Sequence, residues 1–377
     1  MSHLVKTFIA ALVAAHGALA VGTPFGYATG TTGGGNAAPS VPSSPAQLVS
    51  WLGDNIPRGN ESGTICKPWT CSPGAQVAID VNGWCGREQK QAETTTATWK
   101  KAGRTAINVG SNKTLLGKGA AGWIKGKGLR IAGSSNIIIQ NVRFSDINAP
   151  FVWGGDALTI DGGKQIWIDH NYFKDVGRQF IVTGYGAAQG VTISDNVFDG
   201  SGTYSRIHLH LAPAVMAITT GPFTSLALKI PSPSLVTTST RLLVAALESA
   251  VLLLTLRSYT CTTTTLSISP TMLSMLTSVP MFCLRATTST GSSDPRFPGR
   301  SGIVFAPTSG AMNGQCRATL GRDCASNTLL GSGPLADAAN ANAIGYFNNN
   351  VVKSASVMDP SRVGAYVQSN AGTGKIN

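Results

Sequence analysis

Short runs of alternating apolar and polar residues recur through the middle of the chain. Three of them share one register, in which apolar positions are followed by polar residues and then by a phenylalanine: NIIIQNVRF at 136–144, QIWIDHNYF at 165–173 and GVTISDNVF at 190–198. Alternation with a period of two predicts a short strand, and Asn or Asp favours a turn after it. Each copy therefore predicts a strand, a turn and a second short strand.

A unit of this size cannot bury its apolar face alone, so the copies must stack on one another. The intervals between copies are irregular and hold no amphipathic helix, which argues against a leucine-rich repeat or a β/α array. We therefore predict an all-β fold, a right-handed single-stranded parallel β-helix. The alternative is a β-sandwich, but sandwich strands would not repeat the Asn-x-Phe turn in register.

The N-terminal residues predict where the protein is located. The first residues, MSHLVKTFIAALVAAHGALA, combine an early lysine, an apolar run and a small-x-small ending at Ala20. This pattern predicts a secretory signal peptide at 1–20, too short for a membrane anchor, and hence a secreted, extracellular protein. We expect residues 21–377 to form a single domain. Export makes N-glycosylation possible at Asn60 and Asn112, each in an Asn-x-Ser/Thr sequence.

Export also permits disulfides. The chain has seven cysteines, of which an early cluster suggests a bridge from Cys66 to Cys85 and a late pair suggests one from Cys316 to Cys324. Cys71 is left without an obvious partner, which is unusual for a secreted protein. The net charge of +12 would suit an acidic polymer as partner, although a basic balance is often only a solubility feature.

Six motifs carry a resemblance to a known family: SNKTLLGKG, IKGKGLRI, NIIIQNV, WGGDALTID, IWIDHNYF and VGRQF. Together they resemble the secreted fungal pectin lyases of the pectate lyase superfamily, from near Gly30 to about Ser205 and weakly around QCRATLGRDC. The resemblance implies a right-handed parallel β-helix that cleaves pectin, the methyl-esterified polygalacturonan, by β-elimination. It also implies a monomer without cofactor or metal, whose partner is neither a nucleic acid nor a membrane.

The reaction itself sets requirements for the site. Elimination removes the proton α to a carboxyl or ester carbonyl, so it needs a base at that carbon and positive charge where the enolate develops. In the calcium-dependent pectate lyases of the same superfamily, calcium held by aspartates supplies that charge. Here Arg178 stands in that place without a neighbouring pair of aspartates. We therefore expect the Arg178 guanidinium to replace the metal and the substrate to be the neutral methyl ester.

Other residues of these motifs have implied roles. Asp156 matches an aspartate of the family's cleft, and we expect it to pair with Arg178, either as a purely structural partner or as the group that orients it. Trp69, Trp84 and Trp153 match cleft tryptophans, whose ring faces suit stacking on uncharged sugars.

Two further pairs of residues are expected to be structural. Asp169 and His170 look like a catalytic pair, but the resemblance implies that His170 is hydrogen-bonded in a turn. We expect Trp123 and Trp167 to lie in the core, where a single tryptophan is most often found.

The amino-acid composition of the chain differs from the rest between about residue 206 and about residue 285. Glycine and asparagine nearly vanish, Leu, Ser and Thr dominate, and Glu248 is the only acidic residue. Regrouping the codons by one base permits, in order, several pectin lyase motifs that the chain lacks, including a cysteine able to pair with Cys71 and the arginine that serves as base. We interpret 206–285 as an out-of-frame reading. Ala245 then occupies the position of the catalytic arginine, and the printed chain should be inactive.

Several alternatives stay open at this point. A calcium-dependent pectate lyase would prefer the charged, unesterified polymer. A non-catalytic pectin-binding protein or the product of a pseudogene would release no unsaturated sugar. A polygalacturonase is disfavoured, because the paired aspartates that inverting hydrolysis requires are not apparent.

Overall fold

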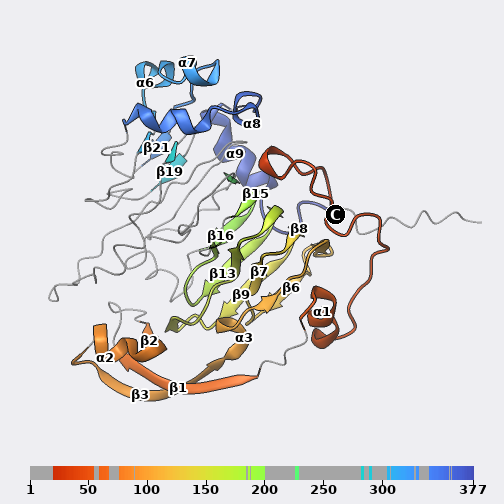
Figure 1. Cartoon of the computed structure of the whole chain (residues 1–377), viewed down its shortest axis with the longest axis vertical. Coiled ribbons are helices and arrows are strands. Elements are labelled where there is room, and N and C mark those ends of the chain that lie inside the picture. Colours follow the sequence, from red (N-terminus) through yellow and green to blue (C-terminus); the bar gives the residue numbers. More distant parts are fainter. Residues whose placement is uncertain are drawn as a thin grey trace, which may run out of the picture.

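The computed structural model describes most of the N-terminal half of the chain and parts of the C-terminal half (Figure 1). The described residues are 20–54, 59–67, 76–88, 90–183, 186, 188–199, 226–228, 282–283, 288–290, 304–305, 307–326, 328–330, 339–355, 357 and 359–377. Several predictions fall outside them: the signal peptide up to residue 19, Trp69, Cys71, Ala245 and all of the segment 206–285 except 226–228 and 282–283.

Three parallel sheets form the body of the molecule (Figure 1). The first sheet contains, in spatial order, β14 (Ile181–Thr183), β11 (Leu158–Asp161), β7 (Leu129–Ala132) and β4 (Ile107–Asn108). The second contains β17 (Leu226–Leu228), β15 (Gln189–Ser194), β12 (Lys164–Asp169), β8 (Ser135–Gln140) and β5 (Lys113–Leu116). The third contains β16 (Val197–Asp199), β13 (Tyr172–Val176), β9 (Arg143–Ile147) and β6 (Trp123–Lys125).

The chain visits the three sheets in turn and then begins the next coil, as β4, β5 and β6 are followed by β7, β8 and β9. Each strand lies parallel to the strand of the coil before it. The strand β17 continues the second sheet by one position, because Leu226 pairs with Val191. The predicted parallel β-helix is therefore confirmed.

Equivalent positions of the sequence repeat lie next to each other on successive coils. Phe144 pairs with Phe173 and Phe173 with Phe198 across the third sheet. The three rings stack inside the coils, with neighbouring centroids 5.1 Å apart and ring planes within 9° of parallel. Phe144 and Phe173 are fully buried. Stacking of equivalent residues is what buries the apolar face that one coil alone would expose.

Buried asparagines line the turn between the second and third sheets. Asn171 donates its side-chain N–H to the Ile139 carbonyl oxygen and to the Asn196 side-chain oxygen, at 2.9 Å each. Asn141, on the preceding coil, donates to the carbonyl oxygen of Gly117 at 2.8 Å and to Oδ1 of Asn377 at 2.9 Å. These amides satisfy backbone groups that a buried turn would otherwise leave unpaired.

A further sheet, here called the arm, lies beside the coils, below β9 and β13 in the view of Figure 1. It is a sheet of β3 (Glu93–Lys100), β1 (Asn60–Lys67), β2 (Val77–Ile79) and β10 (Phe151–Val152), in which β1 is antiparallel to both of its neighbours. The arm also carries η2 (Val81–Gly83), α2 (Trp84–Glu88) and, next to its base, α3 (Lys101–Arg104). The strand β10 lies in the connection from β9 of the third sheet to β11 of the first sheet, and it pairs with β2. This pairing fixes the arm to the coils.

Helices and short strands complete the described structure. They are η1 (Gly26–Ala28), α1 (Pro45–Leu52), β18 (Phe282–Cys283), β19 (Thr288–Thr290), β20 (Val304–Phe305), α6 (Gly310–Gly314), α7 (Arg317–Leu320), β21 (Thr328–Leu330), η3 (Ala341–Phe347), α8 (Asn350–Lys353) and α9 (Pro360–Asn370). Among the described residues, no helix has the length and apolar character that a membrane crossing requires.

The two tryptophans expected in the core differ in their surroundings. Trp167 is 3% exposed and packs with Ala28 and Phe25 on the outer side of the second sheet. Trp123 is 53% exposed, so the prediction that it lies in the core is wrong. Its side chain points outward from β6, where its indole N–H donates to Ser145 Oγ at 2.9 Å and Lys125 lies 4.9 Å from the ring centroid.

Candidate active site

Arg178 and Asp156 lie on neighbouring coils at the entrance to the first sheet. Asp156 comes two residues before β11 and Arg178 three residues before β14, and these strands are paired. The Arg178 backbone N–H donates to the Gly155 carbonyl oxygen at 2.9 Å, which continues the ladder between the two coils. Parallel stacking therefore brings together two residues that are far apart in the sequence.

The Arg178 side chain is held by a bidentate ion pair. Its Nε donates to Asp156 Oδ1 at 2.8 Å, and its Nη2 donates to Asp156 Oδ2 at 2.9 Å. The Gln179 backbone N–H also donates to Asp156 Oδ1, at 3.0 Å. The Asp156 side chain is 12% exposed and that of Arg178 is 34% exposed. The carboxylate is thus largely enclosed, whereas the Arg178 side chain is partly exposed and its guanidinium has a fixed orientation.

The expected pair of Asp156 and Arg178 is therefore present, and it bears on the choice between a metal and a guanidinium. Calcium takes six to eight oxygen ligands. At this position both Asp156 oxygens already accept N–H groups, from Arg178 and Gln179. A fixed positive guanidinium in contact with the carboxylate also repels a cation. The described residues around Arg178 thus do not fit a calcium site.

Of the three expected cleft tryptophans, Trp153 lies next to this ion pair and Trp84 packs against Trp153. Arg178 Cζ is 5.8 Å from the centroid of the Trp153 ring, within the range of a cation–π contact. The Trp84 ring packs edge-on against Trp153, with 5.8 Å between centroids and 64° between planes. Trp84 is only 8% exposed, so the stacking of a sugar on its ring face does not fit this burial.

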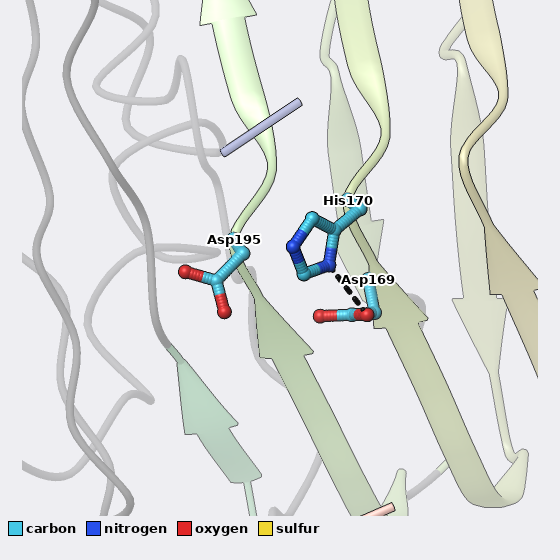
Figure 2. Close-up of side chains that lie close together, drawn as sticks. All are labelled: Asp169, His170 and Asp195. Carbon is cyan, nitrogen blue, oxygen red and sulfur yellow. Dashed lines mark hydrogen bonds and ion pairs between the residues drawn. The ribbon is translucent and has the colours of Figure 1, made fainter. Parts of the chain in front are cut away.

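Asp169, His170 and Asp195 form a second cluster of polar side chains, at the turn after the second sheet (Figure 2). Their donor atoms lie within 4.8 Å of one another, a spacing that a metal ion could bridge. Asp169 Oδ2, however, already accepts from Gln140 Nε2 at 2.8 Å and contacts His170 Nδ1 at 2.7 Å, and Asp169 Oδ1 accepts from Ser194 Oγ. The hydrogen bond expected for His170 in a turn is therefore present, and the structural role of Asp169 and His170 stays a prediction.

The structure contains both suggested disulfides. Cys66 and Cys85 are joined with 5.9 Å between their Cα atoms, and Cys316 and Cys324 with 5.6 Å. The first bridge ties α2, and with it Trp84, to strand β1 of the arm.

The two expected glycosylation asparagines, Asn60 and Asn112, are both exposed. The Asn112 side-chain oxygen accepts a hydrogen bond from Asn136 Nδ2 at 2.8 Å.

Five described groups have clearly shifted pKa values, those of Tyr27, Asp161, Tyr172, Asp175 and Asp359, and none of them belongs to the Arg178 site. The Gly186 N–H that donates to Asp161 lowers the pKa of this carboxyl, and the Arg130 side chain adds to the lowering. Burial raises the pKa of Asp175. Burial and a hydrogen bond to Asp199 raise the pKa of the Tyr172 hydroxyl. The last two shifts arise on the outer side of the third sheet, so they concern stability and not the candidate chemistry.

Sequence patterns did not single out every residue of this site. Gln179 contributes a backbone N–H to Asp156 and a side-chain oxygen 3.3 Å from Arg178 Nη2. Its place directly after Arg178 in the VGRQF motif was the available signal. The conformation of Trp153, with a φ of +65°, carried no signal, because a tryptophan seldom adopts left-handed backbone angles.

The fold and this site define a parallel β-helix protein with a carboxylate-bound arginine beside its first sheet. A sequence profile of the family described as pectate lyase matches residues 1–203. The chain belongs to the pectate lyase family.

Individual relatives are named more narrowly. The chain is 46% identical over 199 residues to a probable pectin lyase A of Aspergillus clavatus, which covers 49% of this chain and 53% of that protein. It is 44% identical over 215 residues to pectin lyase D of Aspergillus niger, which covers 53% of this chain and 58% of that protein. The chain thus matches only about half the length of these curated relatives.

Solved structures give a weaker likeness. A pectate lyase studied for its substrate specificity and anti β-elimination mechanism is 18% identical, with a TM-score of 0.37 over 72% of this chain and 70% of that one. A pectate lyase bound to a hexasaccharide is 16% identical, with a TM-score of 0.36 over the same shares.

Proposed function

We propose that the Arg178 site is that of a pectin lyase. Such an enzyme cleaves internal glycosidic bonds of methyl-esterified polygalacturonan by β-elimination and without a metal. The observation that carries the proposal is the Arg178 guanidinium, held by Asp156 through two hydrogen bonds on a side chain that is partly exposed. The fungal relatives named pectin lyase support the same substrate class.

The reaction assigns a role to each group. A base takes the proton α to the ester carbonyl, and the electron pair left behind expels the glycosidic oxygen from the β-carbon, so that a carbon–carbon double bond forms. The departing oxygen then takes up a proton. Negative charge develops on the ester oxygen as the proton leaves, and a positively charged donor fixed beside that oxygen lowers the barrier. Arg178 supplies this charge, and Asp156 holds it in place.

The neutral ester is the substrate that suits a guanidinium. An unesterified uronate carries a charge that must be neutralised before a second negative charge can develop on it, a task that calcium performs well as a divalent ion. The methyl ester carries no charge at the start, so a single positive charge suffices. Since the described site holds one arginine and one carboxylate bound to it, we assign the esterified polymer.

A second candidate function is the binding of pectin without cleavage. Two observations favour it. The family profile ends at residue 203, close to the change of composition at about residue 206. The position that the resemblance assigns to the base arginine is occupied by Ala245, which lies outside the described residues. Arg178 and Asp156 would then retain recognition of the ester, while proton removal is missing.

An assay of unsaturated products separates these functions. The full chain is incubated with highly esterified pectin and with unesterified polygalacturonate, each with calcium and with a chelator, and the double bond is followed by ultraviolet absorbance. A pectin lyase produces unsaturated products from the esterified polymer, equally with calcium and with the chelator. Binding of esterified pectin without product identifies the second candidate. Calcium-stimulated cleavage of the unesterified polymer overturns both and identifies a pectate lyase.

A further inference from the structure

Trp153 occupies a backbone conformation that a bulky residue rarely adopts. Its φ of +65° lies in the left-handed region, where the Cβ of an L-residue crowds the backbone. Such outliers persist only where the surroundings fix them, and they concentrate at functional sites. The conformational strain at Trp153 therefore suggests that this backbone conformation has a function.

The surroundings of Trp153 do fix this turn. Gly154 donates its N–H to the Phe151 carbonyl oxygen at 3.0 Å, and its own carbonyl oxygen accepts from Asn148 Nδ2 at 2.8 Å. A Cβ on the next residue, Gly155, would clash with the carbonyl oxygen of Gly103 in α3. The Trp153 turn therefore lies tight against the element at the base of the arm.

The left-handed turn at Trp153 determines the position of its ring. The ring contacts both the buried Trp84 ring and the Arg178 guanidinium, because its centroid lies 5.8 Å from the Trp84 centroid and 5.8 Å from Arg178 Cζ. The indole nitrogen of Trp153 is buried and has no hydrogen-bond partner in the part of the chain that the structure describes. An N–H group thus does not explain the placement, whereas the face of the ring does, because it attracts a cation.

The hydrogen bonds of Arg178 leave one nitrogen for a ligand. Nε and Nη2 donate to Asp156, and Nη2 also lies 3.3 Å from the Gln179 side-chain oxygen. Among the described residues, none accepts a hydrogen bond from Nη1. A guanidinium is planar, so two fixed nitrogens and a ring contact determine where the N–H groups on Nη1 point.

We propose that Trp153 is a positioning residue, whose ring, supported by Trp84 and the Cys66–Cys85 bridge, holds the Arg178 guanidinium so that Nη1 faces the ester carbonyl of the substrate. This assignment rests on the proposed function for its ligand. It departs from the expectation that Trp84 and Trp153 are platforms for sugar rings. In this arrangement Asp156 binds the Nε and Nη2 edge of the Arg178 guanidinium. The Trp153 ring prevents the Arg178 side chain from rotating out of the site.

The positioning is tested without substrate, by the reactivity of the arginine. The full-length chain, its Trp153→Leu variant and its Trp153→Phe variant are treated with phenylglyoxal, and modification of Arg178 is measured by mass spectrometry of its peptide. Arg130 serves as an internal reference, because its Nη2 is also bound by a carboxylate, that of Asp161, at 2.6 Å. Trp167→Leu makes the same chemical change at a buried tryptophan on the second sheet.

We expect Trp153→Leu to raise the modification rate of Arg178 roughly three- to tenfold, as the loss of a cation–π contact would allow. Trp153→Phe keeps a ring face and should stay close to the unchanged chain, and Arg130 should not respond. An unchanged Arg178 rate in Trp153→Leu overturns the proposal. So does an equal rise in Trp153→Phe, or an equal rise at Arg178 in Trp167→Leu, because either would mean a general loosening.

A double-mutant cycle then addresses the ligand. The affinity for a methyl-esterified oligogalacturonide is measured by calorimetry for Trp153→Leu, Arg178→Ala and the double variant. If Trp153 acts through Arg178, the double variant binds no more weakly than Arg178→Ala alone. Additive losses overturn the positioning role, because they mean that the Trp153 ring contacts the sugar itself. If the unchanged chain binds no ester at all, the proposed function fails, while the labelling experiment still decides the positioning of Arg178.

Discussion

A single arginine side chain distinguishes this site from a calcium site. Arg178 offers a planar charge whose Nε and Nη2 are bound by Asp156, so its orientation is set before any substrate arrives. An ammonium group has the same charge but cannot make this two-point contact, since it is a compact charge on a flexible stem. The geometry of the guanidinium, and not its charge alone, is what the account requires.

The substitution Arg178→Lys separates geometry from charge. We expect it to weaken the affinity for a methyl-esterified oligogalacturonide about tenfold, because a hydrogen bond to a charged group is lost while the charge is kept. Calorimetry measures the effect, and Arg130→Lys, on the outer side of the first sheet, is the matched control. Equal affinity for Arg178→Lys and the unchanged chain would show that a positive charge in any geometry is sufficient.

The sequence could predict those parts of the site that depend on contacts between neighbouring coils. It could not predict the parts that depend on other tertiary contacts. The contact between Arg178 and Asp156 could be predicted because the two residues belong to motifs on neighbouring coils, and parallel stacking converts such motifs into contacts. The exposure of Trp123 was misjudged, and the burial of Trp84 was not foreseen, because both depend on contacts that no local pattern records. Trp84 is covered where the arm meets β10, and Trp123 projects from a strand whose outer side is open.

At the scale of elements, the strands of the first sheet are held by their outward side chains as well as by the ladder. Asp161, the last residue of β11, accepts the Gly186 N–H at 2.7 Å and pairs with Arg130 of β7 at 2.6 Å. It therefore connects three successive coils on one side of the sheet. The repeat predicted the strands themselves, since Phe144, Phe173 and Phe198 share one register, but it gave no signal for this polar connection.

The stability of this connection should depend on pH. The pKa of Asp161 in the folded chain is lowered, chiefly by the Gly186 N–H. The charged carboxylate therefore stabilises the fold above its ordinary pKa of about 3.8, and this contribution is lost as the pH falls through the folded value. In Asp161→Asn the free energy of unfolding should be lower at neutral pH and should fall less on acidification. Urea denaturation at a series of pH values measures both, and parallel curves for the two chains would contradict this role.

At the scale of the whole molecule, the family likeness and the composition change at nearly the same place. The profile ends at residue 203, and the segment rich in Leu, Ser and Thr begins at about residue 206. A β-helix is built coil upon coil, so a change of reading frame would leave the earlier coils with their own contacts. The coils up to β16 do have a continuous buried core. An out-of-frame segment at 206–285 accounts for both observations.

Sequencing the messenger RNA across codons 205–286 tests this interpretation. We expect a one-base difference near each end of the segment, which restores a family-like reading and places an arginine at the position that Ala245 now occupies. The restored chain should then release unsaturated products from esterified pectin much faster than the printed chain. A transcript that encodes the segment as printed, together with full lyase activity of that chain, would refute the frame interpretation.

The most direct test of the central claim, that a guanidinium does the work of a metal at this site, is a binding measurement that needs no turnover. Calorimetry compares fully methyl-esterified and unesterified oligogalacturonides on the full-length chain, each with excess chelator and then with added calcium. We expect tighter binding of the ester, unchanged by the chelator or by added calcium. Tighter binding of the unesterified oligomer that appears only when calcium is added would contradict it.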